Sequence, residues 1–302
     1  MKRLILTLIL CLSVAIGVRA DIDEWNGVST VTGIDELNGL VIDTDIDEWN
    51  QIAIDAVDYS SIISFINLEG TWTANPCTAD GDYDADSAGE CGFDTEIYCS
   101  GDVAKQTVSP LVGTNSADVV DTQRYFRIEY PSNGHADGAV FAKGQFCILV
   151  DPSGTIPADS SLAAGMIDTD PDNVLWLRFD AGNKLDVVLE DGGTDKLGLS
   201  LETDTSDFHT TTHFVCVAWD FTVGAGSDYV KLYVDGVEED VGDSDDLTVS
   251  DTWSIRFIYA GNYGTNDPVQ SWIWDNHIVS NDPTADLSAL STATTKPTGA
   301  CP

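Results

Sequence analysis

Short runs of β-branched and aromatic residues recur along most of the chain, separated by clusters of Gly, Asp and Pro, and no segment shows a sustained helical period. Many short strands at regular spacing are typical of a β-sandwich or jelly roll. We therefore predict an all-β, antiparallel fold. The predicted strands are Arg124 to Tyr130, Ala139 to Val150, Val174 to Phe179, Leu185 to Leu189, Leu197 to Leu201, Phe214 to Trp219, Tyr229 to Val234, Trp253 to Tyr259 and Gln270 to Val279.

The first twenty residues have the pattern of a secretory signal. Lys2 and Arg3 precede an almost wholly apolar run from Leu4 to Val18, and Ala20 is the small residue that signal peptidase accepts. The apolar run is short for a membrane span, and acidic residues follow it at once. We expect a cleaved signal peptide over residues 1–20 and a secreted, extracellular protein without a membrane span.

The chain is strongly acidic, with 51 Asp and Glu against 13 Lys and Arg and a net charge of −38. Such a field repels nucleic acids and anionic membranes, so the sequence excludes both as partners. Self-repulsion of this size favours divalent cations or high salt as the working medium, so the acidity indicates either a saline environment or dedicated calcium sites. Both interpretations of the acidity remain open.

A repeat follows the signal. Ile22–Gly27, Ile34–Gly39 and Ile46–Gln51 begin at twelve-residue intervals, and the first two end in Asn-Gly, which favours tight hairpin turns. Each unit is too short to bury its own apolar residues, so residues 21–56 are predicted to stack on neighbouring units or on other chains. Trp25 and Trp49 should share one face. The units resemble W-N-G-type tandem repeats found ahead of lectin-like modules.

Two segments of the sequence resemble those of a known fold family. H-F-V-C-V-A-W-D, His213 to Asp220, and Y-V-K-L-Y-V-D-G, Tyr229 to Gly236, resemble the central hairpin of laminin-G-like and pentraxin domains. W-I-W-D-N-H-I-V-S-N, Trp272 to Asn281, is similar to their closing strand. The resemblance covers Arg124 to Pro283, although His213 lies three residues before Cys216 where the family has two. It implies a concanavalin-A-like sandwich, assigned to residues 57–283.

Three side chains in these segments are interpreted as core residues of the sandwich: Trp219, His213 and Trp274. Aromatic residues on sandwich strands bury large areas against the opposite sheet. Residues 284–302 are rich in Thr and Ala and are predicted to form an extended C-terminal tail.

Six cysteines remain after the signal, an even number that predicts up to three disulfides in an exported chain. The pentraxin resemblance implies that Cys147 pairs with Cys216. The other four would then pair among themselves, with three connectivities open: Cys77, Cys91, Cys99 and Cys301.

The segment C-T-A-D-G-D-Y-D-A-D-S-A-G-E-C predicts a calcium site within the Asp- and Cys-rich loop 77–99, because calcium prefers six to eight carboxylate and carbonyl oxygens. The segment is similar to Asp-rich calcium loops of the EF-hand and thrombospondin types. It departs from the EF-hand pattern at Ser87 and Phe93, and a solvated acidic loop is the alternative. The predicted ligands are Asp80, Asp82, Asp84, Asp86 and Glu90.

A second candidate site follows from the pentraxin resemblance. The segment from Ala260 to Asp267 matches the region where that family binds calcium and ligand, but the family's acidic pair is not reproduced. A polar loop with one aromatic ring also suits sugars, and an ordinary turn is the alternative. The candidate ligand-binding residues are Asn262, Tyr263, Asn266 and Asp267.

Enzyme motifs are incomplete. The E-x-D-x-(x)-E strand of laminarinase-type hydrolases is missing. Arg127-Ile-Glu129 and Tyr259 to Tyr263 resemble two of the three alginate lyase motifs, but the lysine and the Gln-x-His of that family are missing. We therefore predict a non-enzymatic, lectin-like module for carbohydrate binding or adhesion, with glycans or a cell or virion surface as partners. The alternatives are a fibre subunit assembled through residues 21–56 and a polysaccharide-acting enzyme.

Overall fold

The structure is a computed structural model, and the residues it describes all belong to one unit, Asp58–Pro302. The predicted signal and repeats, with Trp25 and Trp49, lie outside them. No helix within the described residues is long and apolar enough to cross a membrane. The described residues are 59–77, 83–84, 96–100, 103–119, 124–129, 142–152, 162–168, 172–180, 184–197, 201–202, 211–239, 246–249, 253, 255–262 and 272–300.

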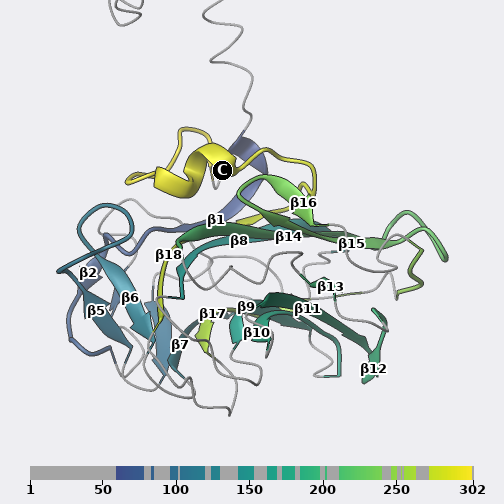
Figure 1. The fold of residues 1–302 in the computed structure, drawn as a ribbon, viewed down its shortest axis with the longest axis horizontal. Coiled ribbons are helices and arrows are strands. Elements are labelled where there is room, and N and C mark those ends of the chain that lie inside the picture. Colours follow the sequence, from purple (N-terminus) through teal and green to yellow (C-terminus); the bar gives the residue numbers. More distant parts are fainter. Residues whose placement is uncertain are drawn as a thin grey trace, which may run out of the picture. The chain divides into compact units, whose positions relative to one another are not determined.

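Two antiparallel sheets lie face to face (Figure 1). The first has eight strands, and β1 and β6 share one edge of β18. Its strands, in spatial order, are β16 (Val237–Glu239), β15 (Tyr229–Val234), β14 (His213–Asp220), β8 (Lys143–Asp151), β18 (Trp272–Ser280), β6 (Ser116–Val119) and β5 (Ala104–Gln106), with β1 (Ile62–Ile66) beside β18.

The second sheet has ten strands, and β13 (Leu201–Glu202) pairs with β11 outside the main order. The predicted all-β antiparallel sandwich is confirmed. The strands of this sheet, in spatial order, are β12 (Thr194–Asp195), β11 (Lys184–Asp191), β10 (Val174–Asp180), β9 (Leu162–Asp168), β17 (Ile255–Asn262), β7 (Arg124–Glu129), β4 (Glu96–Ser100), β3 (Tyr83–Asp84) and β2 (Thr71–Trp72).

The main core lies between the sheets. Trp219, Trp253 and Trp274 are fully buried there, and Trp274 contacts Phe126 of the opposite sheet edge to face, with ring centroids 5.4 Å apart. Large aromatic side chains dominate such cores because each removes a large apolar area from water. The core interpretation of Trp219 and Trp274 therefore holds.

The core interpretation of His213 is wrong. Its side chain is 17% exposed, and its Nδ1 lies 2.7 Å from Oδ2 of Asp235 while its Nε2 lies 2.9 Å from the Thr211 hydroxyl. Asp235 also accepts from Phe214 N at 2.9 Å and begins the Asp-Gly turn between β15 and β16, where its φ is 53°. His213 thus stabilises the surface turn that begins at Asp235, because both of its ring nitrogens have hydrogen-bond partners there, which the apolar core between the sheets would not provide.

A second apolar cluster covers the outer face of the eight-stranded sheet. The C-terminal segment lies on this face and contains a short 3-10 helix, η5 (Ser288–Thr292), while η1 (Tyr59–Ser61) precedes β1. Leu287, Leu290 and Ala300 are buried against the strands. The predicted extended tail is therefore wrong, because its few apolar residues dock onto the apolar outer face of β8 and β14.

The closing strand β18 is interrupted where its register shifts between Asp275 and Ile278. Within this bulge Asn276 has a φ of 39°, a conformation that Asn tolerates better than most residues. Its side-chain amide lies 2.8 Å from the carbonyl oxygen of Leu290 and 3.1 Å from those of Ser291 and Ala293. The bulge therefore holds the C-terminal segment against the sheet.

Two disulfides lie within the described residues. Cys147 and Cys216 occupy directly opposite positions on β8 and β14 and are bonded, as the pentraxin resemblance implied. Cys77 is bonded to Cys99, which is one of the pairings that the sequence left open. Cys91 and Cys301 lie outside the described residues.

Candidate functional site

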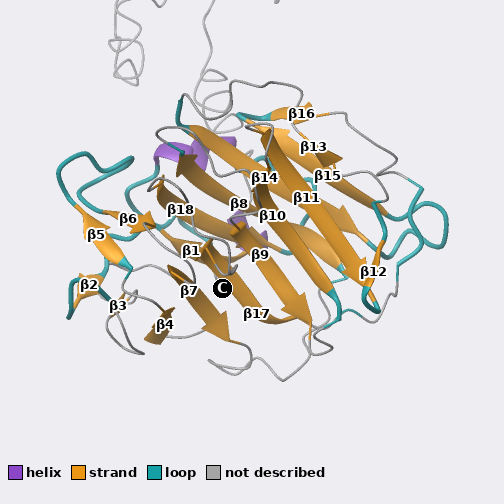
Figure 2. Ribbon diagram, turned by 60° about the horizontal axis from the view of Figure 1, so that its bottom comes forward, coloured by secondary structure: helices purple, strands orange, loops and turns teal. Residues whose placement is uncertain are grey.

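The outer face of the ten-stranded sheet carries an unusual set of side chains. Along β10, Leu175 and Leu177 join the main core, so Trp176 between them projects to the opposite side. The same alternation places side chains of β17, β7 and β4 on this outer side, which comes forward in Figure 2. We call the following set the aromatic face: Tyr98, Tyr125, Arg127, Trp176 and Tyr259.

Strand register aligns four of these residues in one row across the sheet. Trp176 of β10 lies opposite Gly165 of β9, and Gly165 lies opposite Tyr259 of β17. Tyr259 in turn lies opposite Arg127 of β7, which lies opposite Tyr98 of β4. Residues from five strands, distant in sequence, therefore converge because antiparallel pairing fixes each strand against the next.

The rings of the aromatic face contact one another. Tyr259 is 3% exposed and lies between Trp176 and Tyr125, with centroid distances of 5.7 Å and 5.2 Å. Gly165 makes this arrangement possible, because a Cβ there would overlap the Trp176 ring. Trp176 therefore lies over the glycine, and it remains half-buried.

Cationic groups accompany the rings. The guanidinium carbon of Arg127 lies 4.3 Å from the centroid of the Tyr98 ring, within the range of a cation–π contact. Arg178 follows Trp176 by two residues on β10, and its Nε donates to Asp186 of β11 in an ion pair. The Asp186 side chain is 1% exposed and the Arg178 side chain 32% exposed, so the carboxylate is buried while the guanidinium reaches the surface.

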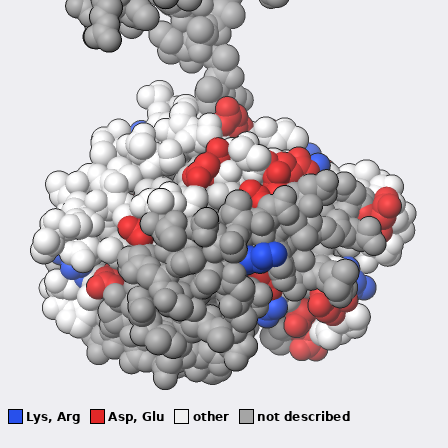
Figure 3. All heavy atoms as spheres, in the orientation of Figure 1, with Lys and Arg blue, Asp and Glu red and all other residues white. Residues whose placement is uncertain are grey.

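These cations stand out against the charge of the chain. Figure 3 shows acidic side chains gathered in several patches of one side of the molecule, with basic side chains in smaller groups. A net charge of −38 repels anionic ligands at long range, and only local cations can offset that repulsion at a binding site. The aromatic face combines such cations with flat apolar rings.

Flat rings beside fixed polar groups suit a ligand that has both apolar and polar surfaces. The C–H faces of a sugar ring pack on aromatic side chains, and its hydroxyl groups accept from guanidinium N–H donors. Neither described histidine, His213 on β14 or His277 on β18, lies on this sheet. The described part of the aromatic face therefore offers rings and guanidinium donors but no imidazole.

The ligand loop predicted from the pentraxin resemblance is described only at its start. Asn262 ends β17 and is fully buried, so its amide is not presented at the surface. Tyr263, Asn266 and Asp267 lie outside the described residues. Of these four predicted ligand-binding residues, the structure therefore places only Asn262, and it places that residue away from solvent.

The predicted calcium loop is also largely outside the described residues, which exclude Asp80, Asp82, Asp86 and Glu90. Asp84 lies on β3, where it pairs with Thr71 and Glu96 of the neighbouring strands. In the described part of the chain no three His, Cys, Asp or Glu side chains come together as metal ligands would.

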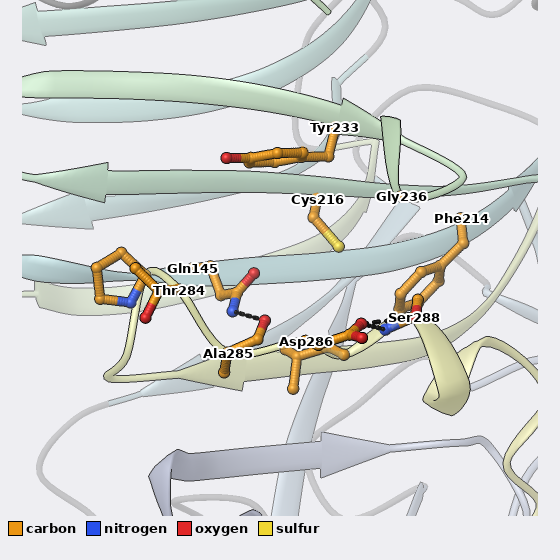
Figure 4. Close-up of a pocket in the computed structure, with 11 residues that line it drawn as sticks. Gln145, Phe214, Cys216, Tyr233, Gly236, Thr284, Ala285, Asp286 and Ser288 are labelled. Carbon is orange, nitrogen blue, oxygen red and sulfur yellow. Dashed lines mark hydrogen bonds between the residues drawn. The ribbon is translucent and has the colours of Figure 1, made fainter. Parts of the chain in front are cut away.

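A small pocket lies on the other sheet, between its outer face and the C-terminal segment (Figure 4). Its volume is about 190 Å³, and Phe214, Cys216 and Tyr233 form its strand side. Gln145 donates to the Ala285 carbonyl at 2.7 Å. Asp286 accepts from the Ser288 hydroxyl at 2.6 Å and from Ser288 N at 3.0 Å, and these two hydrogen bonds hold the pKa of that carboxyl below its usual range. The polar groups of Gln145 and Asp286 are thus already hydrogen-bonded within or to the C-terminal segment. The pocket is therefore a small gap where that segment packs on the sheet.

The aromatic face is a site that no motif in the sequence marks. Arg127 and Tyr259 occur only in fragments of lyase motifs, and Tyr98, Tyr125 and Trp176 belong to none of the motifs in the sequence. A local signal exists in V-L-W-L-R-F-D, Val174 to Asp180, where Trp and Arg alternate with Leu and Phe. Such alternation indicates a half-buried strand, here with Trp176 and Arg178 on its outer face. The row across five strands required the register, which the sequence does not contain.

No protein family and no curated protein matches the chain. Among solved structures it is similar to the receptor-binding domain of botulinum neurotoxin D, with a TM-score of 0.53, 14% identity and coverage of 77% of this chain and 52% of that one. For the botulinum neurotoxin serotype D ligand-binding domain in complex with N-acetylneuraminic acid the values are 0.51, 14%, 79% and 51%. For Trypanosoma rangeli sialidase they are 0.53, 12%, 78% and 32%.

The chain thus spans about half the length of the neurotoxin domains and a third of the sialidase. At these identities the likeness shows the fold alone, a β-sandwich, and says nothing of which residues bind a ligand.

Proposed function

We propose that the chain is a secreted, non-enzymatic module that binds carbohydrate on its aromatic face. The observation that carries this proposal is the row of Trp176, Tyr259, Arg127 and Tyr98 in register across the ten-stranded sheet. A bound sugar would pack its C–H face on the half-buried Trp176 and Tyr98 rings, with guanidinium donors beside it. Tyr125 and Tyr259 would support these rings from below.

Rigidity supports the proposal. Binding costs less when the contacting side chains are already held in their bound arrangement. Tyr259 contacts both Trp176 and Tyr125, and Arg127 is stacked on Tyr98, so the rings of the face hold one another in place. Strands present these side chains more precisely than a loop would.

The similar structures supply independent support at the level of the fold. One of them is a ligand-binding domain in complex with N-acetylneuraminic acid, and another is a sialidase. A β-sandwich of this kind therefore occurs in proteins whose ligands or substrates are sugars. The finer assignment to a concanavalin-A-like, laminin-G-related sandwich rests on the hairpin motifs and is part of the proposal.

Secretion is supported by the predicted signal over residues 1–20 and by two disulfides, which persist in oxidising compartments.

We further propose that the repeats of residues 21–56 present the sandwich or join it to other chains. Calcium at the Asp-rich segment from Asp80 to Glu90 is a third element of the proposal. It is supported by the alternation of carboxylates and by the Cys77–Cys99 bond, which closes the loop that contains them.

A polysaccharide lyase is the alternative that one observation favours. Arg127 and Tyr259, which begin the two partial lyase motifs, are cross-strand neighbours on the aromatic face. Their neighbourhood gives an anionic polysaccharide a place to bind, whereas the lysine and Gln-x-His of that family are missing from the sequence. Formation of unsaturated uronate ends during incubation with polyuronates, followed by ultraviolet absorbance, would establish the lyase and contradict the non-enzymatic proposal.

A glycan array with matched variants tests the proposed function. Trp176→Ala and Tyr98→Ala should each lower binding to the recognised glycan by roughly tenfold or more, as is usual when a stacking ring is removed from a site. Tyr229→Ala is the control, because Tyr229 is also half-buried with a cation, Lys231, 5.7 Å above its ring, but lies on the other sheet. Equal binding by all three variants, or no glycan bound by the wild type, would contradict the proposal.

A further inference from the structure

The arginines of the chain are concentrated on one sheet. Beyond the predicted signal the sequence contains four, and all of them lie on β7, β10 and β17 of the ten-stranded sheet. The strands of the eight-stranded sheet carry no arginine and have lysines at Lys105, Lys143 and Lys231, while the ten-stranded sheet also has Lys184 on β11. These three arginine-bearing strands are also three of those that build the aromatic face. The four arginines are Arg124, Arg127, Arg178 and Arg256.

Among the residues that the structure describes, Arg178 is bound through only one of its donors. A guanidinium has five N–H donors, and the Nε donor of Arg178 is directed at the buried Asp186. The structure gives Arg178 no other hydrogen bond or ion pair among the described residues. Its side chain is 32% exposed, so the fork of Nη donors is oriented by Asp186 and remains accessible.

Arg178 lies beside Trp176, the residue at one end of the aromatic row. It follows Trp176 on the same side of β10, about 7 Å farther along the strand. That distance is comparable to the length of one sugar residue. A sugar ring stacked on Trp176 would therefore place one of its substituents near the Arg178 guanidinium. Arg127, stacked on Tyr98, lies toward the other end of the same row.

We propose that the glycan bound on the aromatic face carries carboxylate groups and that Arg178 binds one of them through its Nη donors. This inference rests on the proposed function and names the class of sugar. Arginine matches a carboxylate with two parallel hydrogen bonds, whereas lysine provides only a point charge. A neutral glycan would leave the guanidinium with hydroxyl acceptors only, which are weaker partners.

The overall charge of the chain sets the conditions of the test. A net charge of −38 repels an anionic glycan, and this long-range repulsion is screened beyond about 8 Å at about 0.15 M salt. The contact between Arg178 and a carboxylate acts over a shorter distance and is screened less. Binding is therefore to be measured at or above that salt concentration.

The experiment compares acidic oligosaccharides with their own neutral derivatives. Tetramers of galacturonate and of mannuronate, and sialyllactose, are each titrated against the full chain beside the same compound with its carboxylates reduced to alcohols. We expect the wild type to bind the acidic member of at least one pair roughly tenfold more tightly. Arg178→Gln should abolish this preference, and Lys143→Gln, which removes an equal charge from the other sheet, should keep it.

A second variant covers the risk that Arg178→Gln unfolds the sheet around Asp186. Arg178→Lys retains the charge beside Asp186 and should melt like the wild type, yet lose most of the preference for the acidic member. Equal binding of both members by the wild type, with binding still lowered by Trp176→Ala, would overturn this inference and leave the proposed function standing. If the wild type bound no member of any pair and no glycan of the array, both would fail.

Discussion

Asp275 accepts a hydrogen bond from the Ser116 hydroxyl at 2.8 Å, and both side chains are fully buried on the outer side of the eight-stranded sheet. Val112 N and Asn276 N donate to the same carboxyl. Burial nevertheless raises the pKa of Asp275 to about 8, because three donors offset only part of the lost hydration. Burial also lowers the pKa of the fully buried His277 to about 3.

The shifted pKa values of Asp275 and His277 predict how the free energy of unfolding depends on pH. The buried Asp275 side chain is protonated in the folded state up to about pH 8. Its contribution to the free energy of unfolding is fully present below about pH 4 and is lost as the pH rises through about 8. His277 acts in the opposite sense, because its contribution is present above about pH 6.5 and is lost as the pH falls through about 3. From about pH 7 to 8, therefore, the Asp275 effect stands alone.

We expect the free energy of unfolding of the wild type to fall from about pH 7 to 8 with a slope of at most about 1.4 kcal/mol per pH unit. Asp275→Asn should remove this slope, since an amide does not titrate. Urea unfolding at several pH values measures both. A wild-type profile that is flat in this range, or an equal slope in the variant, would contradict the prediction.

Asn276 should contribute strongly to the docking of the C-terminal segment. Replacing it with Gly keeps the positive φ at no steric cost and removes the amide that lies within hydrogen-bond distance of three carbonyl oxygens. We expect a loss of about 1–3 kcal/mol in the free energy of unfolding and faster hydrogen exchange over residues 285–293. Asn276→Ala should lose about 1 kcal/mol more, because its Cβ disfavours the left-handed conformation. Unchanged exchange in Asn276→Gly would show that the amide does not hold the segment.

Replacing Gly165, which lies under the aromatic face, with a larger residue should strongly lower the free energy of unfolding. A Cβ at this position would overlap Cε3 of Trp176 and lie 2.6 Å from the carbonyl oxygen of Leu175, so that backbone as well as ring must shift. We expect Gly165→Ala to cost about 2 kcal/mol or more and to increase quenching of tryptophan fluorescence by acrylamide. Gly192→Ala is the control, since its Cβ meets nothing within 4 Å and its positive φ alone should cost about 1 kcal/mol. Equal losses in the two variants would refute the close packing of Trp176 on Gly165.

The strands were predictable where a run of apolar residues alternates and ends at turn residues. The segments around Cys216 and Tyr229 became β14 and β15 with the predicted limits to within one residue. Of the strand predicted over Leu197 to Leu201, the structure places Leu197 outside any strand and packed into the core, and Leu201 at the start of β13, while residues 198–200 lie outside the described residues. The strand β9 was missed because A-A-G-M is weak in β-branched residues, and small residues are required there under Trp176.

The candidate site was less predictable than the fold. Its residues come from β4, β7, β17 and β10, and their pairing depends on which strands are neighbours, which composition and spacing do not fix. The strongest local signals in the sequence are instead loops with concentrated oxygen donors. Of the predicted sugar-binding loop, Asn262 is buried, since it follows the inward alternation of Ile258 and Ala260 along β17.

Calcium should stabilise the fold through the Asp-rich segment. Carboxylates at Asp80, Asp82, Asp84 and Asp86 repel one another, and a bound cation would relieve that repulsion. The Cys77–Cys99 bond joins the ends of the loop that holds them, so metal binding there should be transmitted to β3 and β4. We expect millimolar calcium to raise the melting temperature, with a gain of about 2.7 kcal/mol when free calcium is a hundredfold above its dissociation constant.

The matched variant for calcium is Asp82→Ala combined with Asp84→Ala, which should abolish most of the rise in melting temperature. Ionic-strength-matched sodium chloride is the necessary control, because a chain with a net charge of −38 is also stabilised by general screening. Screening acts on all carboxylates and so should survive the double substitution, whereas a specific site should not. If sodium chloride reproduced the whole effect, or if the double variant responded to calcium like the wild type, the segment would be a solvated acidic loop without a metal site.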